Sequence, residues 1–288
     1  MYWLRYPSLF LQLFIRELHL FNHMNTMIDT HAHVYLSHFD DDKGEMISRM
    51  KEEGVDRVYL PNIDVESMDQ VDQLVEDHPA HFFPMMGLHP CSVKSDYKAQ
   101  LKRLKERLSK GNYIGVGEIG IDLYWDKSYV KEQEDAYRTQ IAWAAEMELP
   151  YVVHSRDSLD MTIGISEELQ DGTHRGIFHC FNGSFEQAQR IMDMNFLLGI
   201  GGVVTFKNAG VDKVVANIPL EFIVLETDAP YLTPTPFRGK RNEPSYLTYI
   251  VNRIAEVKNV NVNTVKRITT ENAMKLFHPE YSDKIEYN

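Results

Sequence analysis

The sequence predicts an α/β protein, a single (β/α)8 TIM barrel with an extra C-terminal helix and a short N-terminal extension. Eight short apolar runs alternate along the chain with segments whose apolar residues recur at helical spacing. The apolar runs are nearly continuous, as expected for parallel strands that are buried on both faces. The chain has 288 residues, enough for a barrel of this type, which needs about 250.

The expected strands follow one another at intervals that leave room for a helix between each pair. A parallel barrel requires such a helix, because the chain must return to the start of the next strand. The eight strands are expected at residues 27–34, 55–63, 81–90, 113–121, 150–157, 176–183, 196–206 and 221–230.

Helical patterns fill the segments between these strands. Leu101, Leu104 and Leu108 form one apolar stripe. Ser184 and Gln187 have the spacing of a capping box at the start of another helix. The buried face of that second helix is expected to consist of Phe185, Ala188, Ile191 and Met192.

Two more helices are expected after the eighth strand. Pro244 has the position of a first helical residue, where the missing N–H of proline is tolerated. The apolar residues that follow it at helical spacing are Leu247, Ile250, Val251, Ile254 and Val257. A final helix at residues 263–277 is expected to cap the barrel.

Residues 27–288 are expected to form one domain, because no linker rich in proline, glycine or serine divides them. Residues 1–26 are expected to be a non-catalytic extension, with Met24 or Met27 as candidates for the natural start. The apolar run at residues 9–15 is too short to span a bilayer, so no transmembrane segment is expected. An amphipathic helix on a membrane surface is the alternative for this segment.

The composition is that of an ordinary globular protein, with 43% hydrophobic and 25% charged residues. A net charge of −12 argues against a protein that binds a polyanion over a broad surface. The two cysteines, Cys91 and Cys180, exclude a disulfide framework and favour a reducing, cytoplasmic location. Both are expected to be packing residues rather than metal ligands.

Histidines and acids stand near the C-terminal ends of six of the eight expected strands. In a TIM barrel these ends meet at one face, where active sites lie. His31 and His33 are two residues apart, so in a strand their imidazoles point to the same side. The other side chains that could bind a metal are His89, Glu118, His154, His179 and Asp228.

Taken singly, each of these residues has a structural explanation, such as a turn residue or a hydrogen-bonded core histidine. Five imidazoles and two carboxylates buried together without a cation would leave several groups unsatisfied, at roughly 1–3 kcal/mol each. Divalent cations remove that cost, and a ligand set without sulfur suits zinc, manganese or magnesium. Glu118 can bridge two cations, because a carboxylate has two oxygens. The pattern therefore predicts a two-metal centre.

Cationic side chains in neighbouring loops favour a substrate that contains phosphate. Arginine forks suit phosphate, and lysine supplies a point charge. The basic run after the eighth strand contributes Arg238, Lys240 and Arg241, while Arg156 and Lys207 lie in other loops. Positive charge around the site of an otherwise acidic molecule favours the end of a nucleic-acid strand or a small phosphoester as substrate, rather than a nucleic-acid duplex.

Eight stretches of the sequence together resemble the TatD family of metal-dependent deoxyribonucleases, which are amidohydrolase-like TIM barrels. In chain order the stretches are DTHAH, GLHP, GEIGIDLYW, HSRD, FHCFNGS, VTFKNA, LETDAPYLTP and RGKRNEP. They occur in the family's order and extend over residues 27–277. Ala32 and Asn182 depart from the family pattern, in which cysteine and serine are common at these positions.

The resemblance implies which residues hold the metals and the substrate. The expected ligands of the first metal are His31, His33, Glu118 and Asp228. The expected ligands of the second metal are Glu118, His154 and His179. His89 is expected to touch substrate phosphate or a third, weaker cation. The residues expected to orient the phosphodiester are Arg238, Lys240 and Arg241.

The resemblance also implies the reaction. Two divalent metal ions, Mg or Mn with Zn as the alternative, are expected to activate water for hydrolysis of phosphodiester bonds in DNA. The expected activity is that of a 3′-5′ exonuclease on single-stranded ends, with Asp228 as proton shuttle and Glu118 as the second catalytic residue. Nucleic acid is the expected partner, no stable protein partner is expected, and a monomer is favoured over an oligomer.

Other interpretations stay open. The same metal barrel could hydrolyse a cyclic amide or an aminoacyl ester, although such barrels often carry a carbamylated lysine where this chain has Glu118. A non-enzymatic metal-binding scaffold is the second alternative, but none of the expected ligands is missing. Asp29 either orients a ligand histidine or begins a turn. Tyr124 and Trp125 either stack on a terminal base or pack against helices, and packing is favoured.

Overall fold

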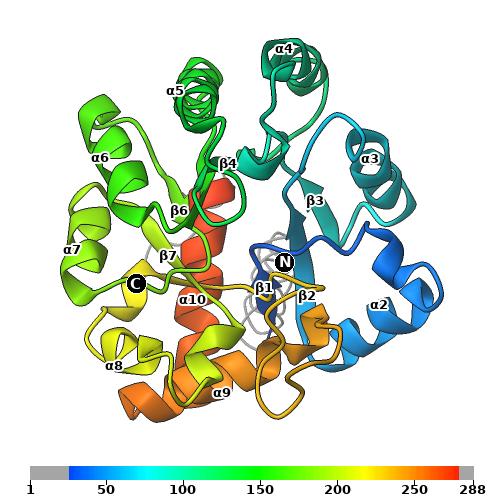
Figure 1. Ribbon diagram of the computed structural model, residues 1–288. Helices are drawn as coiled ribbons and strands as arrows, with labels where there is room; N and C mark the ends of the chain where they lie inside the picture. The colour runs from blue at the N-terminus through cyan, green and yellow to red at the C-terminus, as the bar shows by residue number, and fades with distance from the viewer. Residues whose placement is uncertain (1–25, 279–288) are drawn as a thin grey trace, which may run out of the picture.

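The computed structural model describes residues 26–278, which form a (β/α)8 barrel (Figure 1). Parallel strands lie in the middle of the molecule, and a ring of helices surrounds them. The predicted fold class is confirmed. The predicted N-terminal extension, residues 1–26, lies outside the described residues apart from Thr26.

Each predicted strand is present, but each is shorter than its apolar run. The strands are β1 (Met27–Asp29), β2 (Val55–Leu60), β3 (Phe82–Pro84), β4 (Val116–Asp122), β5 (Tyr151–Arg156), β6 (Gly176–Phe178), β7 (Leu197–Ile200) and β8 (Ile223–Leu225). The chain leaves β1 at Asp29, for example, and residues 30–34 begin a loop at the C-terminal end of the barrel. Several of the polar residues predicted at strand ends therefore lie in loops.

The barrel closes by backbone pairing between two parallel sheets, ordered β1–β2–β3 and β4–β5–β6–β7–β8. A bridge between Met85 and Gly115 joins β3 to β4. A second bridge, between Ala32 and Ala229, joins the chain just beyond β1 and β8. Further backbone hydrogen bonds of 2.7 to 2.9 Å cross this second junction. The first and last strands are thereby held side by side.

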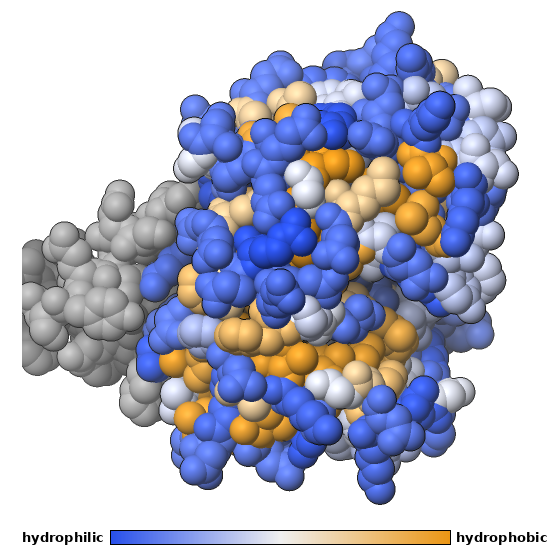
Figure 2. Space-filling view, turned by 60° about the vertical axis from the view of Figure 1, so that its left-hand side comes forward, coloured by the Kyte–Doolittle hydropathy of each residue, from blue (hydrophilic) through white to orange (hydrophobic). Residues whose placement is uncertain are grey.

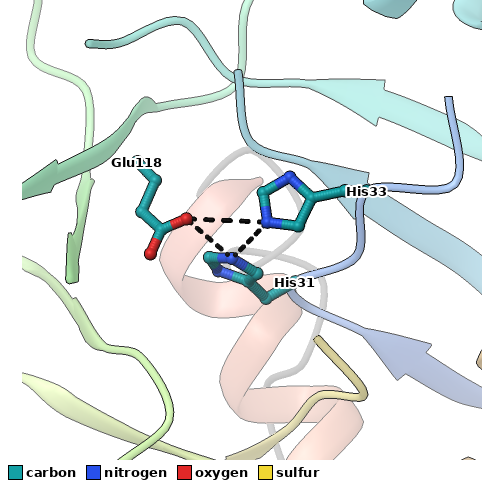
Figure 3. A group of neighbouring side chains, drawn as sticks. All are labelled: His31, His33 and Glu118. Atoms are coloured by element: carbon teal, nitrogen blue, oxygen red, sulfur yellow. Dashed lines mark hydrogen bonds and ion pairs between the residues drawn. The ribbon is translucent and has the colours of Figure 1, made fainter. Parts of the chain in front are cut away.

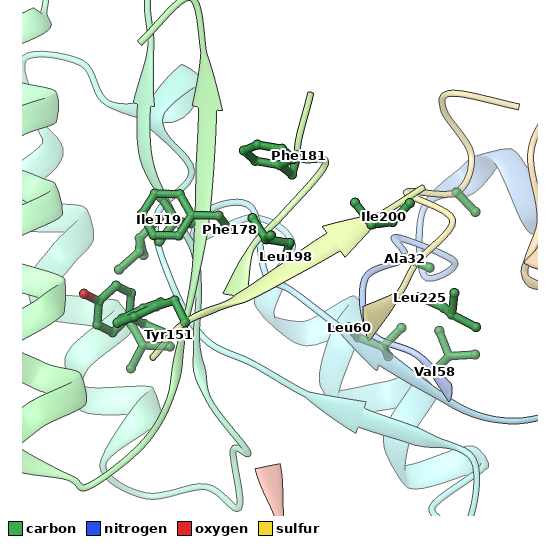
Figure 4. Packing of buried hydrophobic residues seen from close by; sticks show 14 of the residues in the cluster. Ala32, Val58, Leu60, Ile119, Tyr151, Phe178, Phe181, Leu198, Ile200 and Leu225 are labelled. Atoms are coloured by element: carbon green, nitrogen blue, oxygen red, sulfur yellow. The ribbon is translucent and has the colours of Figure 1, made fainter. Parts of the chain in front are cut away.

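Successive residues of a strand point alternately into the barrel and toward the helices. In β2, Tyr59 belongs to the cluster that fills the barrel, whereas Val58 and Leu60 pack between strands and helices (Figure 4). In β8, Val224 is inside and Leu225 is outside. Because both sides of each strand are buried, both alternating positions are apolar, which explains the continuous apolar runs of the sequence.

The helices that follow the strands form the outer layer. They are α2 (Lys43–Glu52), α3 (Met68–Asp77), α4 (Tyr97–Leu108), α5 (Val130–Glu146), α6 (Leu159–Leu169), α7 (Phe185–Asp193), α8 (Val211–Val215) and α9 (Leu247–Lys258). The predicted stripe of α4 is confirmed, because Leu101, Leu104 and Leu108 are all buried.

The predicted capping box is present at the start of α7. The hydroxyl of Ser184 accepts the backbone N–H of Gln187 at 3.2 Å, and the Gln187 side chain accepts the N–H of Ser184 at 2.9 Å. The prediction for Phe185 is wrong, because its side chain is 43% exposed. Helical side chains point toward the N-terminus, so a ring at the first position extends past the helix instead of over the sheet. The other predicted residues, Ala188, Ile191 and Met192, are buried.

Pro244 begins a short 3-10 helix, Pro244–Tyr246, that leads directly into α9. The apolar residues predicted for α9 are buried except Val257, which is half-buried. The predicted final helix corresponds to α10 (Val262–Phe277), which crosses the middle of the ring in Figure 1. Phe277 of α10 packs with the cluster inside the barrel, so this helix closes the end opposite the loops described above.

Within residues 26–278, none of the helices has both the length and the hydropathy that a membrane span requires. On the face seen in Figure 2, hydrophilic residues surround smaller apolar patches. Such scattered apolar residues are usual on the surface of globular proteins and need no special role.

We predict that Phe277→Ala lowers the free energy of unfolding by about 3–5 kcal/mol, because it removes a buried ring from the base of the barrel. Phe277 is 6% exposed and its ring centre lies 4.7 Å from that of Tyr59. Urea denaturation would measure the change. Val260→Ala is the control, since Val260 is 38% exposed. Equal midpoints for the two variants would contradict the proposed closing role of α10.

Candidate metal centre

The C-terminal face of the barrel brings all seven predicted metal-binding side chains together. A barrel can do this because the C-terminal ends of its parallel strands open on one face. The seven residues are His31 and His33 after β1, His89 after β3, Glu118 in β4, His154 in β5, His179 after β6 and Asp228 after β8.

The first group of side chains surrounds one oxygen of Glu118. The Nε2 atoms of His31 and His33 are 3.2 Å apart and lie 3.2 and 3.6 Å from Glu118 Oε2 (Figure 3). The Oδ1 atom of Asp228 lies 3.8 and 3.7 Å from the same two nitrogens. Four candidate ligand atoms therefore face one another across one small space.

The spacing of these atoms fits a divalent cation. Protein ligands lie about 2.1 Å from zinc or magnesium, so neighbouring ligands of a tetrahedral or octahedral ion are about 3.0–3.4 Å apart. The separations of His31 Nε2 from His33 Nε2 and from Glu118 Oε2 fall in this range. Two facing imidazole nitrogens share at most one proton, whereas both lone pairs can bind one cation.

The second group surrounds the other oxygen of Glu118. Its Oε1 atom lies 2.7 Å from His154 Nδ1, 3.3 Å from His179 Nε2 and 3.7 Å from His89 Nε2. Among residues 26–278, the ligand atoms of His89, Glu118 and His154 all lie within 4.8 Å of one another. The geometry thus adds His89 to the side of Glu118 where the sequence predicted His154 and His179.

Burial keeps several of the imidazoles neutral. It lowers the pKa of His31 well below its ordinary value, that of His33 to about 4 and that of His89 to about 3. Burial would raise the pKa of Glu118, but the surrounding imidazoles hold this pKa well below its usual range. Neutral imidazoles and an ionised carboxylate are the forms that bind cations.

Three members of the centre have raised pKa values. Burial lowers the pKa of His154, but its hydrogen bonds to Asp122 and Glu118 outweigh burial and raise it. Burial lowers the pKa of His179, but the facing carboxylates of Glu226 and Glu118 outweigh burial and raise it to about 10. Burial, together with the nearby charge of Glu118, raises the pKa of Asp228 to about 7. A cation at this centre would favour loss of the protons from these three groups, because cations and protons compete for the same ligand atoms.

Two buried carboxylates that the sequence analysis did not single out face the histidines. Asp122 Oδ2 lies 3.0 Å from His154 Nε2, and Glu226 Oε1 lies 3.2 Å from His179 Nδ1. A carboxylate on the second ring nitrogen fixes the tautomer and orientation of a metal-binding histidine. Both acids stand in the motifs GEIGIDLYW and LETDAPYLTP, but local spacing cannot show that they point at histidines on other strands.

Asp29 connects the first strand to the last. Its carboxylate accepts the backbone N–H of His31 at 3.3 Å, and the N–H and hydroxyl of Thr227 at 2.9 and 2.5 Å. Burial raises the pKa of Asp29 to about 8. Asp29 therefore positions His31 through its backbone rather than through its ring.

A glycine in β7 leaves room for Glu226. The Glu226 side chain is fully buried, and its Oε1 atom accepts the backbone N–H of Cys180 at 2.6 Å. A Cβ added at Gly199 would lie 2.1 Å from Glu226 Oε2. Any side chain at Gly199 must therefore displace the carboxylate that faces His179.

The three predicted phosphate contacts lie in the loop after β8 but differ in their surroundings. The Arg241 guanidinium donates to both oxygens of Asp42, at 2.6 and 2.8 Å, so a phosphate would have to compete with this carboxylate. Arg238 and Lys240 are exposed, and neither forms an ion pair with a carboxylate among residues 26–278. These two are the available cations of the loop.

The two aromatic residues after β4 are exposed. The exposed fractions of Tyr124 and Trp125 are 51% and 71%, so the favoured expectation that they pack against helices is wrong. The physical reason is their backbone: Asp122 Oδ1 accepts the N–H groups of both residues, at 2.9 and 3.3 Å, and holds the loop at the barrel mouth.

The sequence matches a family of known enzymes over nearly the whole described region. The model of the family described as "TatD related DNase" matches residues 28–278. The chain is 40% identical over 252 residues to the uncharacterized metal-dependent hydrolase YabD of Bacillus subtilis, covering 87% of this chain and 98% of that protein. It is 31% identical over 258 residues to the 3′-5′ ssDNA/RNA exonuclease TatD of Pantoea ananatis, covering 87% and 99% of the two chains.

The fold is also similar to that of solved structures. The crystal structure of YjjV, a TatD homologue from Escherichia coli, superposes with a TM-score of 0.83 at 26% sequence identity. The similarity covers 88% of this chain and 98% of that protein.

We predict that Glu226→Gln weakens the binding of Mn²⁺ about 10- to 100-fold, because the variant no longer places a negative charge beside His179. Gly199→Ala should have a similar effect by displacing the same carboxylate. Isothermal titration of the metal-free protein would measure the affinity without reference to activity. Gly44→Ala is the matched control, because a Cβ at Gly44 meets nothing within 4 Å. Unchanged affinity in both site variants would exclude an orienting role for Glu226.

Proposed function

The chain belongs to the family of TatD-related DNases and is a metal-dependent hydrolase, and from this premise we propose that it is a nuclease. Its proposed substrate is DNA with a single-stranded end, from which it removes nucleotides in the 3′-5′ direction by hydrolysing phosphodiester bonds. The observation that carries the proposal is the position of Glu118, whose Oε2 faces one set of histidines and whose Oε1 faces the other.

The two sides of Glu118 would hold two divalent cations. The ligands of the first would be His31, His33, Glu118 and Asp228. The ligands of the second would be Glu118, His154 and His179. His89 Nε2 lies 3.7 Å from Glu118 Oε1, on the side of the second set. There it would touch a phosphate oxygen of the substrate or a third, weaker cation. The mixed donor set admits two kinds of cation, because imidazole nitrogens suit Zn and carboxylate oxygens suit Mg or Mn. We propose Mg or Mn, with Zn as the alternative.

Divalent cations bound here would lower the pKa of water and would supply positive charge beside the phosphoryl oxygens. Asp228 is the residue that accepts a proton from the attacking water and returns it to the leaving oxygen. Its side chain is 14% exposed, whereas that of Glu118 is 2% exposed. Asp228 is therefore open to substrate and solvent, while Glu118 keeps the two sides of the site at a fixed separation.

The cations of the β8 loop would orient the substrate. Arg238 and Lys240 would neutralise charge that develops on the phosphate oxygens. Because the whole chain carries a net charge of −12, this local positive charge favours a strand end over a duplex wrapped around the surface. Relatives from Pantoea ananatis and Pectobacterium atrosepticum that are named 3′-5′ ssDNA/RNA exonucleases support both the substrate class and the direction.

We predict that the purified protein shortens single-stranded DNA in the presence of Mg²⁺ or Mn²⁺ and that EDTA stops the reaction. A 3′-labelled oligonucleotide should lose its label at once as a mononucleotide, whereas a 5′-labelled one should give a ladder of shortening products. Denaturing gel electrophoresis distinguishes these patterns. Internal cuts in an oligonucleotide blocked at both ends would identify an endonuclease instead, and no cleavage of any strand would contradict the proposal.

We predict that Asp228→Asn lowers the rate of trimming at least 100-fold while the variant keeps its fold, because the amide cannot carry the proton. Single-turnover trimming gives the rate, and circular dichroism with thermal unfolding checks the fold. Asp193→Asn is the matched control, since Asp193 is exposed on α7. Trimming by Asp228→Asn at the rate of the parent would remove Asp228 from the proposed mechanism.

A further inference from the structure

The metal centre leaves unexplained an exposed group of flat side chains beside it. Tyr124 and Trp125 lie in the loop after β4, and their rings meet edge to face at 4.7 Å between centres. The guanidinium carbon of Arg156, from the end of β5, lies 3.7 Å from the centre of the Tyr124 ring and 5.3 Å from that of Trp125. We call these three residues the aromatic platform.

The platform is attached to the metal centre through one carboxylate. Asp122 Oδ1 accepts the backbone N–H groups of Tyr124 and Trp125, and its Oδ2 lies 3.0 Å from His154 Nε2. Arg156 follows His154 by two residues in β5, so the two side chains leave the strand on the same face, about 6.6 Å apart along it. A substrate bound at the histidines would therefore reach the platform with its next nucleotide.

A cleft of about 750 Å³ adjoins the platform. The loops after β4, β5 and β6 line it, with Tyr124, Arg156 and Asn182 among the lining residues. Two acids, Asp157 and Asp160, also line the cleft. Asp160 is engaged by Arg190 at 3.2 Å, whereas Arg156 forms no ion pair with a carboxylate in the described part of the chain. The guanidinium of Arg156 is therefore packed against the Tyr124 ring, and it can bind a ligand in the cleft.

We propose that the aromatic platform is a stacking subsite for the nucleobase next to the scissile phosphodiester of a single-stranded nucleic acid. This proposal rests on the proposed function and adds the way in which the strand is held. The base stacks on the open face of Trp125, while Arg156, packed on Tyr124, faces the base or its phosphate. Every base has a flat aromatic face, and stacking on aromatic side chains with an adjacent cation is a common way to hold single strands.

The platform also defines which strands can bind. A base paired within a duplex cannot present its face to Trp125, so the subsite selects unpaired ends or single strands. Stacking does not read the hydrogen-bonding edge of a base, so we expect weak dependence on sequence. We expect the subsite to accept DNA and RNA alike, because stacking on an aromatic ring uses the base and not the sugar.

Fluorescence tests the stacking contact directly. The probe is a single-stranded DNA oligonucleotide with 2-aminopurine as the second nucleotide from the 3′ end, bound in Mg²⁺ to full-length Asp228→Asn so that it is not cleaved. Stacking on Trp125 should quench the probe, and adding Trp125→Ala should restore most of its fluorescence. Trp125→Phe should retain most of the quenching. The effect of Arg156→Ala is measured by the kinetics described next. Its control is Arg103→Ala, because Arg103 is exposed on the outside of α4.

Kinetics provides the second readout. In the active enzyme, Trp125→Ala and Arg156→Ala should each raise the KM for single-stranded DNA about tenfold, with a smaller change in kcat. If the parent trims DNA but Trp125→Ala neither restores probe fluorescence nor raises KM, the subsite is refuted and the proposed nuclease function stands. A parent that neither binds nor trims any single strand would overturn both.

Discussion

The carboxylate of Glu118 is the group around which the candidate site is organised. It is a negative charge buried inside a protein, and such a charge is tolerated only where neighbouring groups compensate it. Its Oε2 atom faces His31 and His33, and its Oε1 atom faces the histidines from the other side, with His154 nearest. These residues come from different strands, so compensation exists only while the barrel is closed. One shared carboxylate makes two sets of histidines into one centre.

Closure of the barrel is itself secured by a buried acid. Asp29 bonds to Thr227, a residue 198 positions away in the chain, and so holds the end of β1 against the end of β8. That contact places His31 beside Asp228. At the opposite end, apolar side chains and α10 fill the barrel. The polar groups of the interior are therefore concentrated at one open face, where a substrate can reach them.

The candidate centre and its surroundings are mechanically linked. Asp122 contacts the ring of His154 with one oxygen and the backbone of the platform loop with the other. A ligand that moves the backbone of Trp125 would therefore also displace Asp122, which orients His154. Under the proposed function, binding of a nucleic-acid strand at the platform and positioning of His154 would be coupled through Asp122.

The sequence by itself determined the eight strands, the capping box at Ser184 and the set of histidines and acids at strand ends, because these depend on local spacing and residue type. Only the tertiary structure decided which oxygen of Glu118 faces which histidine, and that Glu226 lies against His179. It also decided that Arg241 pairs with Asp42, 199 residues away. Such contacts join side chains that are distant along the chain, and their geometry follows from the register and closure of the barrel, which no local pattern encodes.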